Sequence, residues 1–315
     1  MTTVFHQGEL AIQTESGVDK RTHKLGNKLI RDHIIDQHKE FFEGLSYVFV
    51  ALHDGDAKPW VSLVQGPAGF INSPDDKTLN LTGEVIASDA LGLQTNEGEP
   101  IGVVGLDLST RRRNRLNGNL NGASKKGYLS ISVEHSFGNC PKYIQARSFE
   151  NSFEEQNVED PQQSAVEGFT EFDDRDIALI KKSDTLFIAS AEKPGGNLDA
   201  SHRGGRPGFL HVESNTQFWF NDYPGNNYFQ TFGNIQNHPH IGLMLIDFKT
   251  GDLLLMSGEA RLEKTKDNNG EANKDLAFLE RRCYFTLNKG LRVKRALKGK
   301  WSDVEISPFL GDDLD

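Results

Sequence analysis

Short runs of aliphatic and aromatic residues, bounded by Gly, Pro, Asn or Asp, recur along most of the chain. In the first half they cover residues 47–52, 78–83, 101–108 and 128–135. In the second half they cover residues 185–191, 207–213, 217–222, 242–248 and 252–262. Runs of this length between turn residues are typical of β-strands, and residues 249–252 (KTGD) read as a hairpin turn between two of them. The pattern predicts a mainly β protein.

Helical spacing is limited to a few segments. Apolar side chains from Ile30 to Leu45 recur three, four and seven residues apart, which predicts a helix there. A shorter helix is predicted around Ile177, capped by Asp174, and another within residues 224–239. The predicted fold class is therefore β with minor α.

The two halves of the sequence share a pattern. Gly66, Gly69 and Phe70 match residues 139 positions later, and the run that begins at Ile101 matches the run that begins at Ile241 with an offset of 140. A nearly constant offset indicates internal duplication. We therefore expect two tandem antiparallel barrels, residues 1–150 with a helical N-terminal arm and residues 169–315. Residues 151–168, which are acidic and Gln-rich, are the expected linker.

Composition narrows the classes of function. The 315 residues carry a formal net charge of −10, so no overall basic field favours nucleic acid or an anionic membrane. The only two cysteines, Cys140 and Cys283, are too few for a disulfide scaffold and suit a reducing cytoplasm. Residues 1–13 (MTTVFHQGELAIQ) lack a basic segment followed by an apolar stretch, and no window reaches the ~20 apolar residues of a membrane span, so we expect neither secretion nor membrane insertion. We expect a cytoplasmic protein.

The segment 199–212 is unusual in this acidic chain because it combines His202, Arg203 and Arg206 with several glycines. Glycine lets the backbone approach an anion closely, and the arginine fork matches phosphate oxygens. The segment reads as a phosphate cradle; an exposed basic hairpin loop is the alternative. At the matching positions of the first half, residues 62–65 read Ser-Leu-Val-Gln, so the fold itself does not need the cationic side chains.

Two further segments are candidates for the same site. Asn226, Asn227 and Tyr228 precede a predicted helix whose first N–H groups could bind phosphate, although a capping turn without ligand explains them equally well. Lys142 and Arg147 could add fixed positive charge from the end of the first half.

Other polar motifs are interpreted as structural. Cys140 reads as a small buried residue rather than a nucleophile. The pair His238 and His240 lacks the spacing and the thiols of a metal site, so no metal is predicted. Residues 111–115 (RRRNR) align with a hairpin turn of the second half, so we expect an exposed turn with solvated charges.

Long strings of this sequence resemble the flavin-nucleotide-binding proteins related to pyridoxamine 5′-phosphate oxidase, in their long two-unit form. They include PWVSLVQGPAGFI, FGNCPKYIQAR, SHRGGRPGFL and GNNYFQTFGNIQNHPH. The resemblance implies two split β-barrels with FMN in the groove between them, in a homodimer or in a monomer that acts as an internal pseudo-dimer. It implies that residues 201–204 contact the FMN phosphate and ring edge and that residues 226–228 bring a further phosphate donor. The chain departs from the family in lacking a Lys or Arg at residues 226–228, and residues 295–307 do not match the family's pyridoxal-phosphate-binding pattern.

The implied function is an FMN-dependent oxidoreductase whose substrate, or electron donor, and catalytic residues are not identified. A non-catalytic flavin carrier or sensor, or a haem-binding split barrel, is the alternative. Because the cationic residues are present in one half only, we expect one flavin site per chain. Its predicted residues are Ser201, His202, Arg203, Gly204, Gly205, Asn226, Asn227 and Tyr228, with Lys142 and Gln145 from the first unit.

Overall fold

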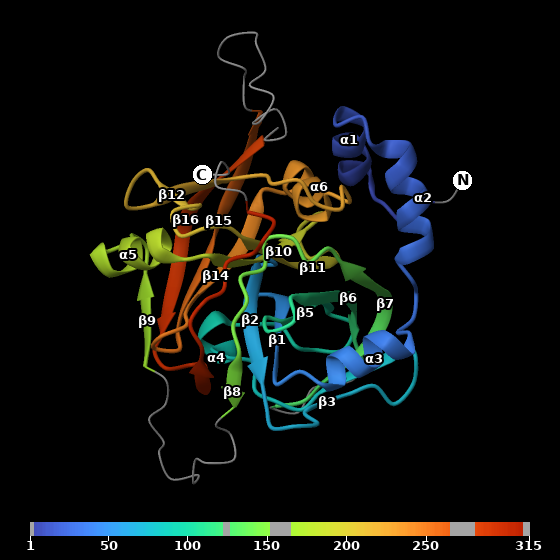
Figure 1. The fold of residues 1–315 in the computed structure, drawn as a ribbon, viewed down its shortest axis with the longest axis horizontal. Helices are drawn as coiled ribbons and strands as arrows, with labels where there is room; N and C mark the ends of the chain where they lie inside the picture. The colour runs from blue at the N-terminus through green and yellow to red at the C-terminus, as the bar shows by residue number, and fades with distance from the viewer. Residues whose placement is uncertain (1–2, 122–126, 152–164, 265–280, 311–315) are drawn as a thin grey trace.

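The computed structural model describes residues 3–121, 127–151, 165–264 and 281–310, which form two large antiparallel sheets with short helices around them (Figure 1). The first sheet has the strand order β2-β1-β5-β6-β7-β4-β3. Its strands are β1 (Tyr47–His53), β2 (Pro59–Gln65), β3 (Ile71–Asn72), β4 (Thr78–Leu81), β5 (Pro100–Asp107), β6 (Arg112–Leu120) and β7 (Leu129–Asn139). The mainly β class predicted from the sequence is confirmed.

The second sheet has the strand order β11-β10-β14-β15-β16-β13-β12, and β9 pairs with β16. Its strands are β9 (Val166–Phe169), β10 (Thr185–Ala191), β11 (Leu198–Gly204), β12 (His211–Val212), β13 (Gln217–Asn221), β14 (His240–Asp247), β15 (Asp252–Lys264) and β16 (Arg281–Val293). The strand predicted over residues 207–213 is reduced to β12, because Gly208 has a φ of 102° and ends a turn there.

The two sheets share one strand order when β1 to β7 are matched in sequence with β10 to β16. Each also has a register shift in its long hairpin, at Asn117/Gly118 in the first sheet and at Ser257/Gly258 in the second. These bulges are 140 residues apart, the same offset that the sequence shows.

Close approach between the sheets depends on matched glycines. A Cβ atom on Gly102 of β5 would lie 2.7 Å from the Ala200 nitrogen of β11, and one on Gly242 of β14 would lie 2.5 Å from the Trp60 Cα of β2. Between them the rings of Phe49 and Phe187 stack with 3.6 Å between centroids. The two sheets therefore share one hydrophobic core, and their backbones approach each other closely at these glycines.

The helices are α1 (Gln7–Glu15), α2 (Asp19–Leu29), α3 (Asp36–Glu43), α4 (Ser88–Leu91), α5 (Asp174–Lys182) and α6 (Gln230–Asn237). The helix predicted over residues 30–45 is wrong in its first part: Ile30 has extended backbone and ends α2, and α3 begins only at Asp36. The cap of α5 is Asp173, whose side chain accepts from the Arg175 and Asp176 N–H groups, rather than Asp174. Among the described residues, no helix has the length and apolar character needed to cross a membrane.

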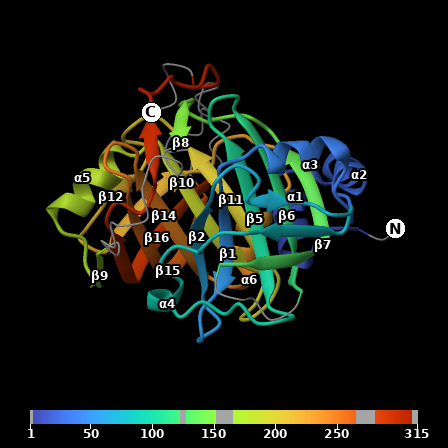
Figure 2. The same ribbon diagram turned by 90° about the horizontal axis from the view of Figure 1, so that it is seen from below.

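The predicted boundaries between the units need correction at both ends. Asn151 belongs to β8 (Phe149–Asn151) and Val166 begins β9, so the expected linker is shorter than residues 151–168; its residues 152–164 lie outside the described residues. Near the C-terminus, β17 (Gly299–Trp301) pairs with β8. At the N-terminus α1 packs on α6 of the second half (Figure 1). Figure 2 shows β5, β6 and β7 at the right of the view and β14, β15 and β16 at the left. Both α1 and β17 thus contact the opposite half.

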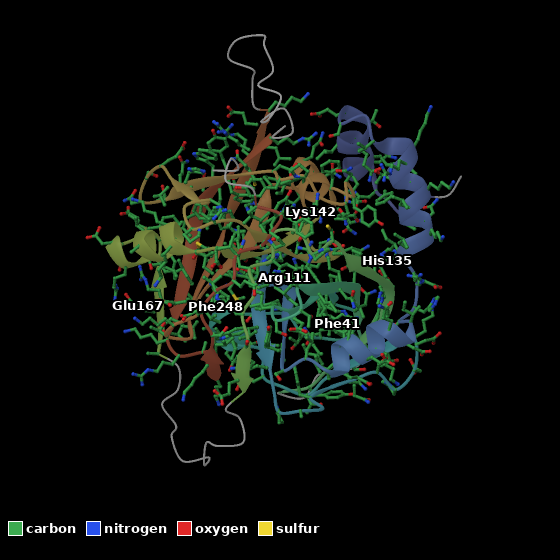
Figure 3. All side chains as sticks on the ribbon, in the orientation of Figure 1. Phe41, Arg111, His135, Lys142, Glu167 and Phe248 are labelled. Carbon is green, nitrogen blue, oxygen red and sulfur yellow. The ribbon has the colours of Figure 1, made fainter. Side chains whose placement is uncertain are left out.

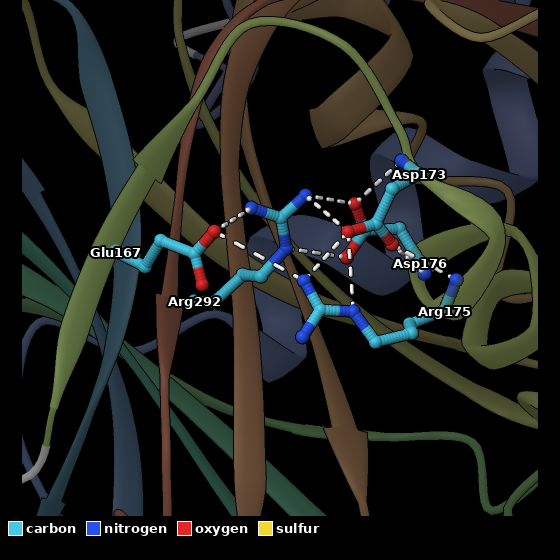
Figure 4. Close-up of polar contacts among 5 residues, drawn as sticks. All are labelled: Glu167, Asp173, Arg175, Asp176 and Arg292. Carbon is cyan, nitrogen blue, oxygen red and sulfur yellow. Dashed lines mark hydrogen bonds and ion pairs between the residues drawn. The ribbon is translucent and has the colours of Figure 1, made fainter.

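An ion-pair cluster links α5 to the strands β9 and β16 of the second sheet (Figure 4). The Arg292 guanidinium of β16 contacts Asp176 through two nitrogens, and also Glu167 at 3.2 Å and Asp173 at 3.4 Å. Arg175 contacts Asp173 at 2.7 Å. The positive charges here are matched by carboxylates, which distinguishes this cluster from the site described next.

Candidate ligand-binding site

A cavity of about 250 Å³ lies where the two halves of the chain meet. Its walls come from the turn between α1 and α2, from β6, from β11 and from the segment between β13 and α6. The lining residues are Ser16, Val18, Arg113, Arg115, Asn139, Ser201, Arg203, Asp222, Tyr223, Pro224, Gly225, Asn226, Asn227, Phe229, Gln230, Thr231 and Arg281. Four of them are arginines and one is an aspartate, so positive charge is in excess.

Strand geometry accounts for the convergence of the arginines. Side chains two residues apart on a strand share a face, which places Arg113 beside Arg115 on β6 and Ser201 beside Arg203 on β11. The two strands lie in different sheets and contact each other, so both pairs line the same cavity.

Arg115 is held by a buried polar network. It donates to Asp199 Oδ1 at 2.7 Å and to the side-chain oxygen of Gln230. Asp199 also accepts from Asn117 at 2.6 Å and from Asn234 at 3.0 Å. The side chain of Arg115 is 3% exposed, so this network fixes its position at the wall of the cavity.

The guanidinium groups of Arg113 and Arg203 are less fully paired than that of Arg115. Arg113 donates to the carbonyl oxygens of His202 and Cys140, each at 3.0 Å. Arg203 lies over the Phe232 ring, 4.7 Å from its centroid. The Nε atoms of Arg113, Arg115 and Arg203 are buried and have no hydrogen-bond partner among the described residues. Buried donors without acceptors are costly, and a ligand oxygen would satisfy them.

Electrostatics agree with an anion site. Burial, followed by repulsion from Arg115 and Arg203, lowers the pKa of Arg113 well below its usual value, to about 9. Burial also lowers the pKa of Arg115, although Asp199 opposes the shift. Three guanidinium groups therefore repel one another at the cavity wall, and a bound anion would relieve that repulsion.

A smaller cavity of about 40 Å³ adjoins the first and shares Arg113, Arg203, Tyr223 and Gly225 with it. Its other lining residues are Cys140, Lys142, Tyr143, His202, Gly204, Phe209, Phe220 and Asn221. A Cβ atom on Gly204 would lie 1.9 Å from the Tyr143 oxygen, so glycine at this position lets the segment after β7 pack against β11. That contact brings Lys142 to the site.

The residues predicted from the sequence divide into three groups. Ser201, Arg203, Asn226 and Asn227 line the larger cavity. His202, Gly204 and Lys142 line the smaller one. Gly205, Tyr228 and Gln145 line neither.

The three residues outside the cavities have structural contacts instead. Gln145 donates to the Gly205 carbonyl at 3.0 Å and accepts from the Ser307 N–H at 2.8 Å. Tyr228 is 4% exposed and packs on Phe5, with ring centroids 5.5 Å apart. They support the site without facing it. Arg147 also lies outside both cavities and donates instead to Asp184, at 3.2 Å from Oδ1.

The structure decides against the alternative interpretation of the cationic segment. Residues 201–204 lie in β11 and His202 is 2% exposed, so the exposed basic hairpin loop does not occur. The helix after Pro224 begins at Gln230, so Asn226 and Asn227 precede it, as the sequence predicted. Phe229, with a φ of 56°, is its N-cap and makes no side-chain capping bond.

Sequence reasoning missed Arg113, Arg115 and Arg281. Residues 111–115 were expected to form an exposed turn, but only Arg111 lies in the turn, with a φ of 55°. Even Arg111 is largely buried, donates to the Ile144 carbonyl at 3.1 Å and lies near the middle of the view in Figure 3. The missed signal is the offset of 140, which aligns Arg113 and Arg115 with the predicted strand at residues 252–262.

The offsets of 139 and 140 residues that match the two halves also define a second location, equivalent to the cavity, and this second location is apolar. The counterparts of Arg113 and Arg115 are Leu253 and Leu255, and the counterpart of Arg203 is Val64. All three are at most 1% exposed and belong to the hydrophobic core. Gln65, at the end of β2, bonds to the backbone of Ala296 and so holds the C-terminal segment over this location. Only one of the two matching locations is therefore polar.

Among the described residues, no group of three or more His, Cys, Asp or Glu side chains is arranged to hold a metal ion. His238 and His240 form a ring contact, with centroids 5.2 Å apart.

No protein-family model and no curated protein matches the sequence. Solved structures resemble part of the chain. One is a protein from Clostridium acetobutylicum related to general stress protein 26 (pyridoxinephosphate oxidase family), with 11% identity over 41% of this chain and 92% of that chain and a TM-score of 0.29. HutZ, the heme storage protein of Vibrio cholerae, has 15% identity over 39% of this chain and 95% of HutZ, with a TM-score of 0.28. An FMN-binding protein from Syntrophomonas wolfei has 14% identity over 38% of this chain and 88% of that protein, with a TM-score of 0.27.

Proposed function

We propose that this chain is an FMN-binding flavoprotein with one site, in which the larger cavity holds the cofactor by its phosphate. The observation that carries the proposal is the convergence of Arg113, Arg115 and Arg203, each with a buried Nε that has no partner among the described residues. Phosphate offers several acceptor oxygens and two negative charges, which suit a group of guanidinium donors better than any neutral ligand does.

The other lining residues fit the same ligand. Ser201, Asn226 and Asn227 add neutral hydrogen-bonding groups to the wall of the cavity. Asp222 is close to Arg281, at 3.5 Å, and does not face the cluster unpaired. Tyr223 and Phe229 supply aromatic surface beside the cationic group, as a flat ring system requires.

When bound, FMN would supply electron or hydride transfer, and the protein would position it. The chain's own contribution is to hold the phosphate and to keep positive charge next to the cofactor, which favours negatively charged states of a bound ring. Arg115 is fixed for this purpose by Asp199, and Arg113 by two carbonyl oxygens.

We further propose that the two sheets arose by duplication and that one of two equivalent sites was lost. The shared strand order, the matched glycines at the interface and the constant sequence offset support this history. The replacement of the arginine positions by Leu253, Leu255 and Val64 accounts for the loss. The chain would then act as an internal pseudo-dimer.

A flavin carrier without turnover is the second candidate function. It is favoured by the lining of the larger cavity, where Asp222 is the only carboxylate in the part of the chain that the structure describes and lies close to Arg281. None of these described lining residues stands out as a general acid or base. Reduction of bound flavin by a nicotinamide cofactor, followed by reoxidation with turnover, supports the oxidoreductase; tight binding without reduction supports the carrier.

The visible spectrum of protein purified from cells tests the proposal, since a yellow protein that releases FMN on denaturation is expected. Arg203→Ala should weaken FMN binding about 10- to 100-fold, the value of one charge-assisted hydrogen bond. Arg206→Ala is the matched control, because Arg206 lies three residues along and contacts the Leu310 carbonyl instead of the cavity. A colourless protein that FMN cannot reconstitute contradicts the proposal.

A further inference from the structure

The smaller cavity contains a hydrogen-bond donor whose direction is fixed by its neighbour. Arg113 Nη1 lies 3.3 Å from His202 Nδ1. A guanidinium group only donates, so Nδ1 must accept and the ring proton must lie on Nε2. His202 Nε2 is buried and has no hydrogen-bond partner among the described residues. An N–H donor is therefore directed at a buried position without an acceptor.

The ring of His202 stays neutral in this environment. Burial and the positive charges of Arg113 and Arg203 hold the pKa of His202 well below its usual value of 6.5. The imidazole thus keeps a single donor, on Nε2, at neutral pH.

The rest of the lining favours a small anion with an apolar side. Arg113, Arg203 and Lys142 contribute positive charge, while Phe209 and Phe220 contribute aromatic surface. A volume of about 40 Å³ admits only a few heavy atoms. A carboxylate combines two acceptor oxygens with a carbon that can contact the aromatic rings, whereas a phosphate group lacks the apolar side and suits the larger cavity.

We propose that the smaller cavity is a subsite for a carboxylate, the head group of the molecule that exchanges electrons with the cofactor. The role of that molecule rests on the proposed function, but the carboxylate site does not. The two cavities share Arg113 and Arg203, so a carboxylate here would lie directly beside the cofactor.

Cys140 provides a built-in reporter of occupancy. It lines the smaller cavity and is partly exposed, whereas Cys283 is fully buried. Alkylation by iodoacetamide should therefore modify Cys140 first. Acetate at ten times its Kd should slow that reaction about tenfold by mass action. Pivalate, which has the same charge and a bulkier carbon group, should have no such effect at equal ionic strength.

Two variants test whether the acetate that protects Cys140 binds in the smaller cavity. His202→Phe removes the Nε2 donor and keeps a ring beside Phe187, and Lys142→Met removes a charge whose described contact is the Phe309 ring. Both should lose the protection by acetate, and Arg206→Ala should retain it. The rise in Tm that acetate produces over pivalate provides a second measurement that does not depend on Cys140.

Three results would overturn the subsite: equal protection by acetate and pivalate, protection that survives both variants, or protection lost in Arg203→Ala but kept in His202→Phe. The last result would place the anion in the larger cavity. The measurement needs no flavin. Acetate protection without FMN binding would thus remove the proposed function and leave the carboxylate site, and FMN binding without acetate protection would do the reverse.

Discussion

Arg115 of β6 and Asp199 of β11 form a buried ion pair, with 2.7 Å between Nη2 and Oδ1. The two strands belong to different sheets and to different halves of the chain. Arg115 also lines the larger cavity, so the contact that joins the halves orients a residue of the site.

Replacing Asp199 should be costly. Asp199→Asn leaves the Arg115 charge buried without its partner and presents NH₂ donors to Asn117 and Asn234, so we expect a loss of roughly 3–5 kcal/mol in the free energy of unfolding. Urea denaturation measures it. Glu305→Gln is the control, because Glu305 is 76% exposed and its ion pair with Arg111 should contribute less than about 1 kcal/mol. Similar losses for the two variants would show that the buried pair is not important.

Arg203→Ala should weaken ligand binding without weakening the fold. In the ligand-free protein Arg203 repels Arg113 and Arg115, and no hydrogen bond of its guanidinium is found among the described residues. We therefore expect the Tm of the ligand-free variant to equal or exceed that of the wild type. The rise in Tm that inorganic phosphate produces should be smaller in the variant. A large drop in Tm without ligand would instead assign Arg203 a structural role.

Stability should decline with rising pH because of Glu9. Burial, and then the charge of Asp199, raises the pKa of this side chain from 4.5 to about 9, so it is protonated in the folded protein and ionised in the unfolded chain between those values. The stabilisation of the folded protein by protonated Glu9 is complete below pH 4.5. Between pH 4.5 and about pH 9, ionisation of Glu9 in the unfolded chain should lower the free energy of unfolding by up to about 1.4 kcal/mol per pH unit. Denaturation at pH 5.5, 7 and 8.5 should show a flatter profile for Glu9→Gln, and parallel profiles would contradict this account.

The N-terminal helices should be required for ligand binding. A Cβ atom on Gly8 of α1 would lie 2.2 Å from the Gly233 oxygen of α6, so Gly8→Ala should displace α1. Ser16 and Val18, which follow α1, line the larger cavity and should be displaced with it. We expect lower stability and weaker phosphate binding.

Gly55→Ala is the control for this prediction, since a Cβ atom there meets nothing closer than 3.7 Å. Unchanged phosphate affinity in Gly8→Ala would show that the N-terminal segment does not complete the site.

The sequence predicted the strands best where apolar runs are continuous, as in β10, whose bounds match residues 185–191. Such strands are buried on both faces and need no tertiary information. Arg203 was identified because a cationic Gly-rich segment is conspicuous in an acidic chain. Arg113 and Arg115 were not, because a strand rich in charged residues has the composition of a turn, and burial beside Asp199 depends on the other half of the chain.

Contacts made through the backbone were also invisible in the sequence. Gln145 was predicted to contact the cofactor, but its amide bonds to the Gly205 carbonyl and the Ser307 N–H. The docking of α1 on α6 depends on two glycines at one crossing, Gly8 and Gly233, and neither contributes to an apolar periodicity.

We propose that one arginine-lined cavity per chain holds a flavin by its phosphate. Titration of the flavin-free protein with FMN and with riboflavin, followed by flavin fluorescence, tests this proposal most directly. We predict saturation at one FMN per chain, with riboflavin bound at least about 100-fold more weakly, since it lacks the phosphate that the arginines contact. Equal affinity for the two flavins, or saturation at two FMN per chain, would contradict the account.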